Sequence, residues 1–286
     1  MMAECFNGLT FIFDEKSSEL FGLYMGWRDP AEEWETGLNR EPVQGETNIV
    51  RHVVNSYGVK YSDPLTLSFD IFHKDGSEFS YRESRAINNW LVKDNYKKLK
   101  VNDNNTDNVY YRVICTSIQD LTIGNFNGKH VEMKCDSSFA YAQESIKIID
   151  TTTSGFGKWS ADNTSDAGVY YPYFVITCSS DYQDVVEFTN KTDGKTMKID
   201  MTNVPFRDSK ILYVDTAHMQ MTDYEGNIVP LYKVGWEIVP DDNNAVQASD
   251  LYWLRLLPDI NHIEIKGNAK IKFIVSFPRK AGQISE

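Results

Sequence analysis

Residues 81–93 read as a helix, whereas almost every other periodic segment of the chain reads as a strand. Ala86 and Ile87 recur four residues later as Trp90 and Leu91, so one side of the helix is apolar and the other carries charges and amides. Such a helix buries its apolar side on a sheet. We expect Trp90 to anchor that core, because aromatic residues at helical spacing usually pack inward.

Polar residues mark both ends of this helix. Ser80 or Ser84 can cap its start by accepting a hydrogen bond from a free backbone N–H group. Lys93 suits the negative end of the helix dipole, and Asp94 with Asn95 predicts the stop. The helix is therefore expected to be short and to lie between strands.

Alternating or β-branched segments predict strands along the rest of the chain. Residues 65–72 alternate apolar with polar up to the last step, which is typical of a strand with one buried face. Asn127–Gly128 predicts a tight hairpin turn, because this pair tolerates the positive φ angles that such turns require. The strands expected before residue 140 are 6–13, 20–27, 49–54, 65–72, 98–101, 110–117, 121–126 and 129–135. Those expected after residue 150 are 173–179, 184–190, 195–200, 210–215, 220–224, 228–233, 253–256, 262–266 and 270–277.

The two halves of the chain differ in organisation. With 286 residues, 41% of them hydrophobic, the chain is long enough for two ordinary domains with separate cores. Residues 150–157 and 162–166 lack periodicity and predict a linker and a loop. We therefore expect a mainly β protein, with an N-terminal α+β domain of residues 1–145 that has one helix on β-sheets, and a C-terminal antiparallel β-sandwich of residues 146–286.

A polar segment, residues 28–48, interrupts the N-terminal strands. It holds Pro30, Gly37, Pro42 and Gly45 and shows no clear period. The segment is too long for a tight turn, so we expect it to reach out as an arm or extended loop, with a plain surface loop as the alternative.

Charge and hydropathy exclude several classes of protein. The net charge of -12 and the lack of a Lys and Arg cluster argue against direct binding of nucleic acid. No apolar run is long enough to cross a bilayer and no signal peptide is visible, which predicts a soluble protein made in the cytoplasm. Cys5, Cys115, Cys135 and Cys178 include no C-x-x-C pair and are expected to be reduced and buried.

Motifs for catalysis or ligand binding are missing from the sequence. It has no nucleophile elbow, phosphate loop, dinucleotide fingerprint or zinc-protease motif. The five histidines are scattered, and none has a second ligand at metal spacing. The oxygen-rich segments 103–108 and 223–227 lack the spaced acids of a calcium loop and are expected as turns. We therefore predict no enzyme, no catalytic residue, no cofactor and no metal site.

The order of several short motifs resembles the distal tail proteins of phages with long, non-contractile tails, the siphoviruses. The resemblance covers most of the chain. In the N-terminal half it rests on Phe6-Asn7-Gly8, Ser17-Ser18, Phe21-Gly22-Leu23, Val43-Gln44-Gly45, Trp90-Leu91, Leu99 and Tyr110-Tyr111-Arg112-Val113. It continues with Phe139, residues 211–215 and residues 256–263. Five of these residues are taken as structural anchors, namely Gly45, Trp90, Leu91, Leu99 and Tyr111.

Two departures from the family pattern concern loops. Glu46 stands where the family usually has a second glycine after the one that matches Gly45. Asp259 and Ile260 replace a glycine expected before Asn261. These differences affect the expected loop conformations and leave the architecture unchanged.

The resemblance implies a baseplate hub. Its N-terminal domain would build a ring of six copies, a homo-hexamer alone or as two rings back to back, with a galectin-like C-terminal sandwich on the outside. The ring would join the tail tube protein to the tail-tip or tail-associated protein and carry receptor-binding proteins for host attachment. The protein would then be a structural part of the virion, assembled in the host cytoplasm, with no membrane insertion.

Two other classes of function remain open. A carbohydrate-binding, lectin-like module is one, because Trp236 and Glu237 resemble the Trp and Glu of galectin sugar sites and aromatic faces stack on sugars. A wall-degrading enzyme of the same tail is the other, and only the abundance of acidic residues favours it.

Overall fold

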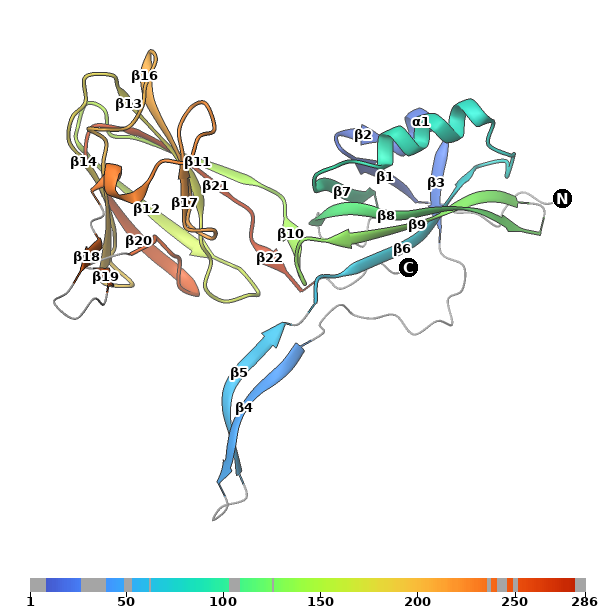
Figure 1. Ribbon diagram of the computed structural model, residues 1–286, viewed down its shortest axis with the longest axis horizontal. Helices are drawn as coiled ribbons and strands as arrows, with labels where there is room; N and C mark the ends of the chain where they lie inside the picture. The colour runs from blue at the N-terminus through green and yellow to red at the C-terminus, as the bar shows by residue number, and fades with distance from the viewer. Residues whose placement is uncertain are drawn as a thin grey trace. The chain divides into compact units, whose positions relative to one another are not determined.

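The fold is mainly β, as predicted, with one α-helix in the described part of the chain (Figure 1). The computed structural model describes residues 9–26, 40–48, 53–61, 63–102, 109–124, 126–235, 238–240, 246–248 and 252–280. The chain divides into two compact units, which we call unit 1 (Met1–Gln143 with Pro278–Glu286) and unit 2 (Glu144–Phe277). A continuous C-terminal domain reaching residue 286 is therefore wrong, because the chain returns to unit 1 after Phe277.

Unit 1 is built on a nine-stranded sheet, in which seven strands run in the order β2-β1-β7-β8-β9-β6-β3. The other two are β10, which pairs with β8, and β22, which pairs with β10. Its strands are β1 (Thr10–Phe13), β2 (Lys16–Ser17), β3 (Leu23–Gly26), β6 (Thr66–His73), β7 (Lys97–Asn102), β8 (Val109–Ile123), β9 (Phe126–Cys135), β10 (Ala140–Ala142) and β22 (Pro278–Arg279). A 3-10 helix, η1 (Ser18–Phe21), replaces the first part of the strand expected at residues 20–27. Antiparallel pairing throughout explains why connections as short as a turn suffice.

The predicted helix is α1 (Tyr81–Leu91), and it lies across one face of the unit 1 sheet (Figure 1). Ser80 is the residue that caps it: its side chain accepts a hydrogen bond from the Glu83 backbone N–H, and Glu83 accepts one from the Ser80 backbone in return. At the other end, the Lys93 ammonium donates to the Asn89 carbonyl oxygen at 3.0 Å. These caps satisfy backbone groups that the short helix leaves free.

The two ends of the unit 1 sheet meet. Leu9, directly before β1, forms a bridge with Met25 of β3, with N···O distances of 3.1 and 2.8 Å in the two directions. β1 therefore contacts β7 on one side and β3 on the other, so the sheet closes on itself. Closure pairs the backbone groups that an open sheet would leave at its edges.

The hairpin between β8 and β9 turns earlier than the sequence predicts. Ile123 pairs with Phe126, which places the reversal between them, where Gly124 has a φ of +58°. Gly128 instead lies inside β9, where an added Cβ atom would collide with the ring of Phe72. The prediction of a turn at Asn127–Gly128 was wrong because a close approach of a neighbouring side chain, as well as a turn, requires glycine.

Strands β4 (Arg40–Asn48) and β5 (Val53–Tyr61) form a two-stranded sheet of their own (Figure 1). Their pairing shifts register twice, between Pro42 and Gln44 and again between Gln44 and Thr47. The segment 28–48 thus contains a strand, β4, where the sequence suggested irregular structure. The strand expected at 49–54 is also displaced, because β5 begins at Val53 and continues to Tyr61. Part of the predicted arm, residues 28–39, lies outside the described residues.

Unit 2 is a β-sandwich of antiparallel sheets. A five-stranded sheet runs in the order β11-β21-β13-β16-β17, with β11 (Ser145–Asp150), β13 (Tyr173–Ser179), β16 (Ser209–Asp215), β17 (Gln220–Thr222) and β21 (Lys270–Val275). A four-stranded sheet runs in the order β12-β20-β14-β15, with β12 (Phe156–Asn163), β14 (Val185–Asn190), β15 (Lys195–Asp200) and β20 (Asp259–Lys266). A small separate pair consists of β18 (Ile238–Pro240) and β19 (Val246–Ala248).

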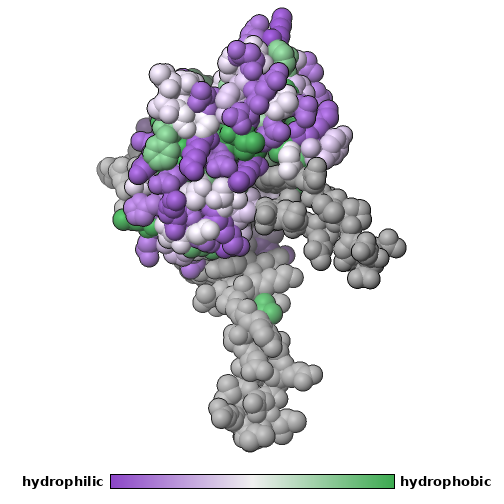
Figure 2. All heavy atoms as spheres, turned by 90° about the vertical axis from the view of Figure 1, so that its left-hand side faces the viewer, coloured by the Kyte–Doolittle hydropathy of each residue, from purple (hydrophilic) through white to green (hydrophobic). Residues whose placement is uncertain are grey.

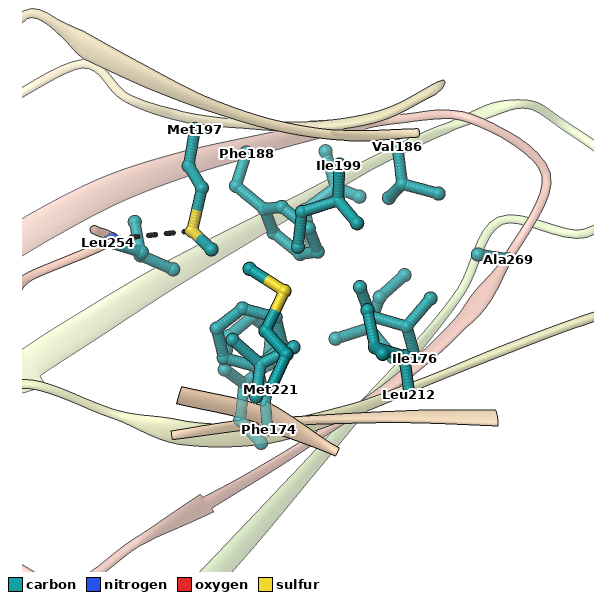
Figure 3. Packing of buried hydrophobic residues seen from close by; sticks show 14 of the residues in the cluster. Phe174, Ile176, Val186, Phe188, Met197, Ile199, Leu212, Met221, Leu254 and Ala269 are labelled. Atoms are coloured by element: carbon teal, nitrogen blue, oxygen red, sulfur yellow. Dashed lines mark hydrogen bonds between the residues drawn. The ribbon is translucent and has the colours of Figure 1, made fainter. Parts of the chain in front are cut away.

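The core of unit 2 lies between its two sheets (Figure 3). Phe174 of the five-stranded sheet meets Phe188 of the four-stranded sheet with 4.9 Å between ring centroids. Phe273 lies 5.1 Å from Phe174, measured between centroids. Met197 fills the end of the core, and its sulfur accepts a hydrogen bond from the Leu254 backbone N–H at 3.4 Å. The inward-facing residues of the two sheets thus interdigitate, as the alternation of apolar and polar residues along the strands predicts.

Several local predictions in unit 2 were wrong. The tract expected as linker, residues 150–157, contains the end of β11 and the start of β12. Residues 228–233 were expected as a strand, but the chain forms a 3-10 helix there, η2 (Leu231–Val234), after Pro230. Residues 253–256 form no strand, and Leu256 makes only an isolated bridge with Tyr170. Short apolar runs do not distinguish a strand from a buried irregular segment.

Candidate functional site

An aromatic cluster around Trp90 joins α1 to the closed sheet of unit 1. The Trp90 ring stacks on Phe11 and Phe21, with centroid distances of 5.5 and 4.5 Å, and meets Phe13 edge-on at 6.1 Å. Its indole Nε1 donates a hydrogen bond to the Phe13 carbonyl oxygen at 3.0 Å. Burying this N–H with a partner avoids the free-energy cost of an unpaired polar group.

The other apolar anchors named from the sequence lie in the same core. Leu91 and Leu99 are fully buried, and Tyr111 is 2% exposed. Leu99 of β7 pairs directly with Tyr111 of β8. Burial raises the pKa of the Tyr111 hydroxyl well above its usual range, so this group stays neutral.

The Ser17-Ser18 and Phe21-Gly22 motifs close the first turn of unit 1. Ser17 caps η1 by accepting from the Glu19 backbone N–H, and Ser18, fully buried, accepts from the Phe11 backbone N–H at 3.1 Å. Gly22 ends η1 with a φ of +65°, a conformation that favours glycine, and thereby aims the preceding Phe21 at Trp90. These motifs therefore act together on one core.

The hairpin β4–β5, which we call the arm, offers a different surface. Among the described strands, each of its two strands pairs only with the other. Gly45 lies in β4 between two register shifts, at a position where the ladder is irregular. Val43 is exposed, with 42% of its surface accessible. A two-stranded ribbon of this kind has backbone N–H and C=O groups along both outer edges that a further chain can pair with.

A polar row crosses β6 and β9 on the side of the sheet away from the core. His130 Nδ1 lies 2.6 Å from the Asp70 carboxylate, and His130 Nε2 lies 3.2 Å from Ser68 Oγ. Asp70 is 1% exposed, whereas Ser68 is exposed. The register places Asp70 directly opposite His130 and Ser68 opposite Glu132 on the two neighbouring strands. The row is therefore assigned as a cross-strand polar contact.

Buried asparagines hold the segment after Tyr252 in unit 2. Asn261, fully buried, accepts from the Leu257 backbone N–H at 2.9 Å and donates to the Leu257 carbonyl at 2.7 Å. Asn190 donates to the Arg255 carbonyl at 2.8 Å and to the Asn261 side chain at 3.0 Å. Asn163 donates to the Leu257 carbonyl at 3.1 Å. Three side chains thus satisfy the backbone of an irregular segment that no strand pairs with.

The same segment carries an ion pair. Arg255 donates from Nε and Nη2 to the two oxygens of Asp193, at 2.9 and 3.0 Å, and Tyr252 donates to the same carboxylate at 2.8 Å. Asp193 is 8% exposed. The hydrogen bonds from Arg255 hold the pKa of Asp193 below its usual range. All three groups satisfy one another, so this cluster fastens the loop to the β14–β15 turn.

Metal and sugar sites find little support in the described residues. No group of three His, Cys, Asp or Glu side chains there is placed to hold a metal ion. Asp223 accepts hydrogen bonds from the backbone N–H groups of Glu225 and Asn227, which is turn chemistry. Trp236 and Glu237, the predicted sugar contacts, lie outside the described residues.

The cysteines that the structure describes are free thiols. Burial raises the pKa of Cys135 to about 12 and that of Cys178 to about 11. Neither forms a thiolate at neutral pH, so both behave as small apolar core residues. Cys115 is half-buried, and burial also raises its pKa. Cys5 lies outside the described residues.

The described helices include none that is long and apolar enough to span a membrane.

In its described part, the chain combines a closed sheet that carries one helix with a β-sandwich, and it then returns to unit 1. This arrangement defines a class of two-unit, mainly β proteins. Residues 6–137 match the family model described as a phage tail protein N-terminal domain. A search among curated proteins found no match.

Solved structures of phage tail components share the fold over nearly the whole chain. The Dit protein of phage SPP1, described as a paradigm of the hub adsorption apparatus in phages infecting Gram-positive bacteria, is 14% identical with a TM-score of 0.57. The similarity covers 94% of this chain and 99% of that one. Chains of the phage P2 baseplate in its activated conformation, with Ca and with Sr, are 9% and 10% identical, with TM-scores of 0.55 and 0.53. They cover 93% of this chain and 97% and 98% of their own.

The resemblance to distal tail proteins stated from the sequence is thereby confirmed. Residues 6–137 thus match a phage tail protein domain, and the fold of the chain is shared with a hub protein and with baseplate chains. The motif residues that carried the resemblance in unit 1, such as Ser18, Phe21 and Trp90, lie in one core, so they identify the fold. The second arm strand, β5, was predicted only in part, because the strand expected at 49–54 overlaps it at residues 53 and 54.

Proposed function

We propose that this chain is a distal tail protein that forms a hexameric ring, the hub that joins the tail tube to the tail-tip protein. Unit 1 builds the ring, and unit 2 stands outside it, where receptor-binding proteins attach. The hub belongs to the virion and is assembled in the host cytoplasm. The proposal assigns the chain a structural role and no enzymatic activity. Its basis is the match of residues 6–137 to a phage tail protein domain and the fold shared with baseplate components.

The single observation that carries the ring is the arm. A ring subunit must present two different surfaces that fit each other head to tail. The closed sheet of unit 1 has its main strands paired on both sides, because the bridge between Leu9 and Met25 joins its ends. The strands β4 and β5 pair only with each other in the described part of the chain. An isolated two-stranded ribbon is marginally stable in water, so we infer that the arm pairs with a neighbouring copy.

Replacing residues 40–61 by a short Gly-Ser linker tests this assignment. The full-length protein, purified alone or after co-expression with the tail tube protein, is expected to give rings of six or twelve copies. The variant without the arm is expected to give folded monomers, because the closed sheet keeps its own pairing. Light scattering measures the mass, negative-stain images show the central hole, and circular dichroism shows that the variant is folded.

Ile228→Ser is the matched control, since Ile228 is 66% exposed and lies in unit 2, outside the arm. This variant should assemble like the full-length protein. Rings formed by the variant without the arm would show that the arm is dispensable. A full-length chain that stays monomeric both alone and with the tail tube protein would contradict the hub itself.

A further inference from the structure

The outer faces of the two sheets in unit 2 differ in chemistry. On the four-stranded sheet, ion pairs join neighbouring strands: Glu264 lies 3.0 Å from Lys191 and 3.7 Å from Lys158, and Glu187 lies 3.1 Å from Lys198. Charged side chains on this face thus pair with one another across the strands. Figure 2 shows the left-hand side of Figure 1, where most of the coloured surface is hydrophilic or neutral.

The five-stranded sheet exposes apolar side chains on the outer face of its edge strand, β11. Its cross-strand register places Ile148 beside Lys272, Lys272 beside Val175, and Val175 beside Tyr213. Ile146 and Ile148 are 57% and 51% exposed. Two large β-branched side chains on one strand, each more than half exposed, form an apolar patch that water solvates poorly.

These isoleucines lie on an edge strand. Among the described strands, β11 pairs only with β21, so its other side presents unpaired backbone N–H and C=O groups. Residues Ile146 and Ile148 point outward, Ile149 is buried, and Lys147 between the two isoleucines is exposed. An edge strand rich in β-branched residues is a template for one more strand from another chain.

The local charge is positive. Lys147 pairs with Phe273 and so lies on the opposite face of β11 from the two isoleucines, whereas Lys272 lies beside Ile148 on the outer face. Neither forms an ion pair with a described residue. The pKa of the nearby Asp150 carboxyl is lowered, mainly because this group accepts hydrogen bonds from Thr152 and also because Lys270 lies opposite it. Each face near the middle of this edge thus has one ammonium group without an ion pair to a described residue, in a chain whose net charge is -12.

A second copy of this strand fits the edge poorly. In an antiparallel pair of two β11 strands with Ile148 facing Ile148, the two Lys147 side chains would be diagonal neighbours on the same face. Two ammonium groups this close on one face repel each other. An incoming strand with an acidic residue facing Lys147 removes that repulsion and adds an attraction.

We propose that β11 is the docking edge for an extended segment of another protein, which adds as a strand with the pattern apolar, acidic, apolar. The apolar residues of that segment cover Ile146 and Ile148, and its carboxylate, on the opposite face of the added strand, lies beside Lys147. Backbone hydrogen bonds supply affinity, and the single carboxylate supplies selectivity. That the partner is another tail protein rests on the proposed function, whereas the docking chemistry does not.

A synthetic peptide tests the docking chemistry on the full-length protein. The probe is a nine-residue threonine peptide with Val-Glu-Val at its centre, and its control has Val-Lys-Val in the same place. At millimolar concentration the Glu peptide is expected to slow hydrogen exchange at the backbone N–H groups of β11, because pairing removes them from water. It is expected to bind about fivefold more tightly than the Lys peptide, as measured by the fluorescence anisotropy of a dye attached to each peptide.

Charge reversal sharpens the test. Lys147→Glu is expected to reverse the preference, so that the Lys peptide binds more tightly. Lys158→Glu, a reversal on the edge strand β12 of the other sheet, is the matched control and should leave the preference unchanged. Exchange at β11 that neither peptide slows, or equal binding of both peptides, overturns the proposal. Protection of β11 that grows with the concentration of the chain alone also overturns it, because the occupant is then a second copy. These outcomes are independent of ring formation.

Discussion

Unit 1 closes its sheet, whereas unit 2 leaves both of its sheets open. In unit 1, Leu9 and Met25 bring the ends of the sheet together and α1 covers the core (Figure 1). In unit 2, the described strands β11 and β17 end one sheet, and β12 and β15 end the other. In a closed sheet, the backbone N–H and C=O groups through which a sheet could pair with another chain are already hydrogen-bonded. A closed unit therefore needs an added element such as the arm, while an open sandwich already carries its own docking edges.

The two cores also differ in how their contacts are distributed. In unit 1, the contacts between helix and sheet converge on Trp90, which touches three other aromatic rings. In unit 2, aromatic and aliphatic residues pack together in the core (Figure 3). Polar side chains fasten its irregular segments. Unit 1 should therefore be sensitive to one substitution, and unit 2 should lose stability in smaller steps.

Trp90→Ala should have the largest effect. It removes the stacked ring and the hydrogen bond to the Phe13 carbonyl, and we expect a loss of about 4 kcal/mol of unfolding free energy in unit 1. Urea unfolding followed by hydrogen exchange, resolved by unit, measures the loss. Val92→Ala, at the exposed end of the helix, should change little, because Val92 is 55% exposed. Equal shifts in both units would mean that the cores are not independent.

Arg255→Gln should have an intermediate effect, confined to unit 2. The variant leaves the Asp193 carboxylate, 8% exposed, without its two charged hydrogen bonds, which costs about 2 kcal/mol. Because Arg255 lowers the folded pKa of Asp193 below 3.8, the stabilisation is present above that pH and is lost as the pH falls below it. Urea midpoints measured across acidic pH should therefore fall more steeply for the natural chain than for the variant. Parallel curves would rule out Asp193 as the titrating group.

Asp259→Gly should have the smallest effect and the opposite sign. Asp259 has a φ of +70°, in the left-handed region that favours glycine, so the variant should gain about 0.5 kcal/mol. The comparison variant is Ile260→Gly, whose residue has no positive φ and lies in β20, and it should lose stability. Thermal unfolding of the two variants measures both. A loss in both would indicate that the Asp259 side chain has a role of its own.

The elements with the strongest sequence period were predicted correctly. Weaker patterns led to wrong predictions where contacts with distant residues determine the structure. The spacing of Trp90 and Leu91 predicted a helix with a buried face, and α1 has one. Gly128 was assigned to a turn because its sequence neighbour is Asn127, yet the ring of Phe72 occupies the space where a side chain would lie. No local pattern reveals a side chain that approaches from another strand.

The departure at Asp259 shows the same division between local and tertiary information. The resemblance located a missing glycine before Asn261 but did not say which residue takes its conformation. The positive φ of Asp259 identifies the position. The hydrogen bonds of Asn261 to the Leu257 backbone explain why the segment must turn there.

The amino-acid sequence by itself determined the fold class, the single helix and the alternation of buried and exposed residues, because these depend on residues close together in the chain. It also carried the motifs that resemble distal tail proteins. Only the tertiary structure decided which edges are closed and which are open. The bridge between Leu9 and Met25, the self-paired arm and the unpaired side of β11 each depend on which distant strands meet. Strand partners are chosen by packing across the whole core, and the period of a single strand does not encode them.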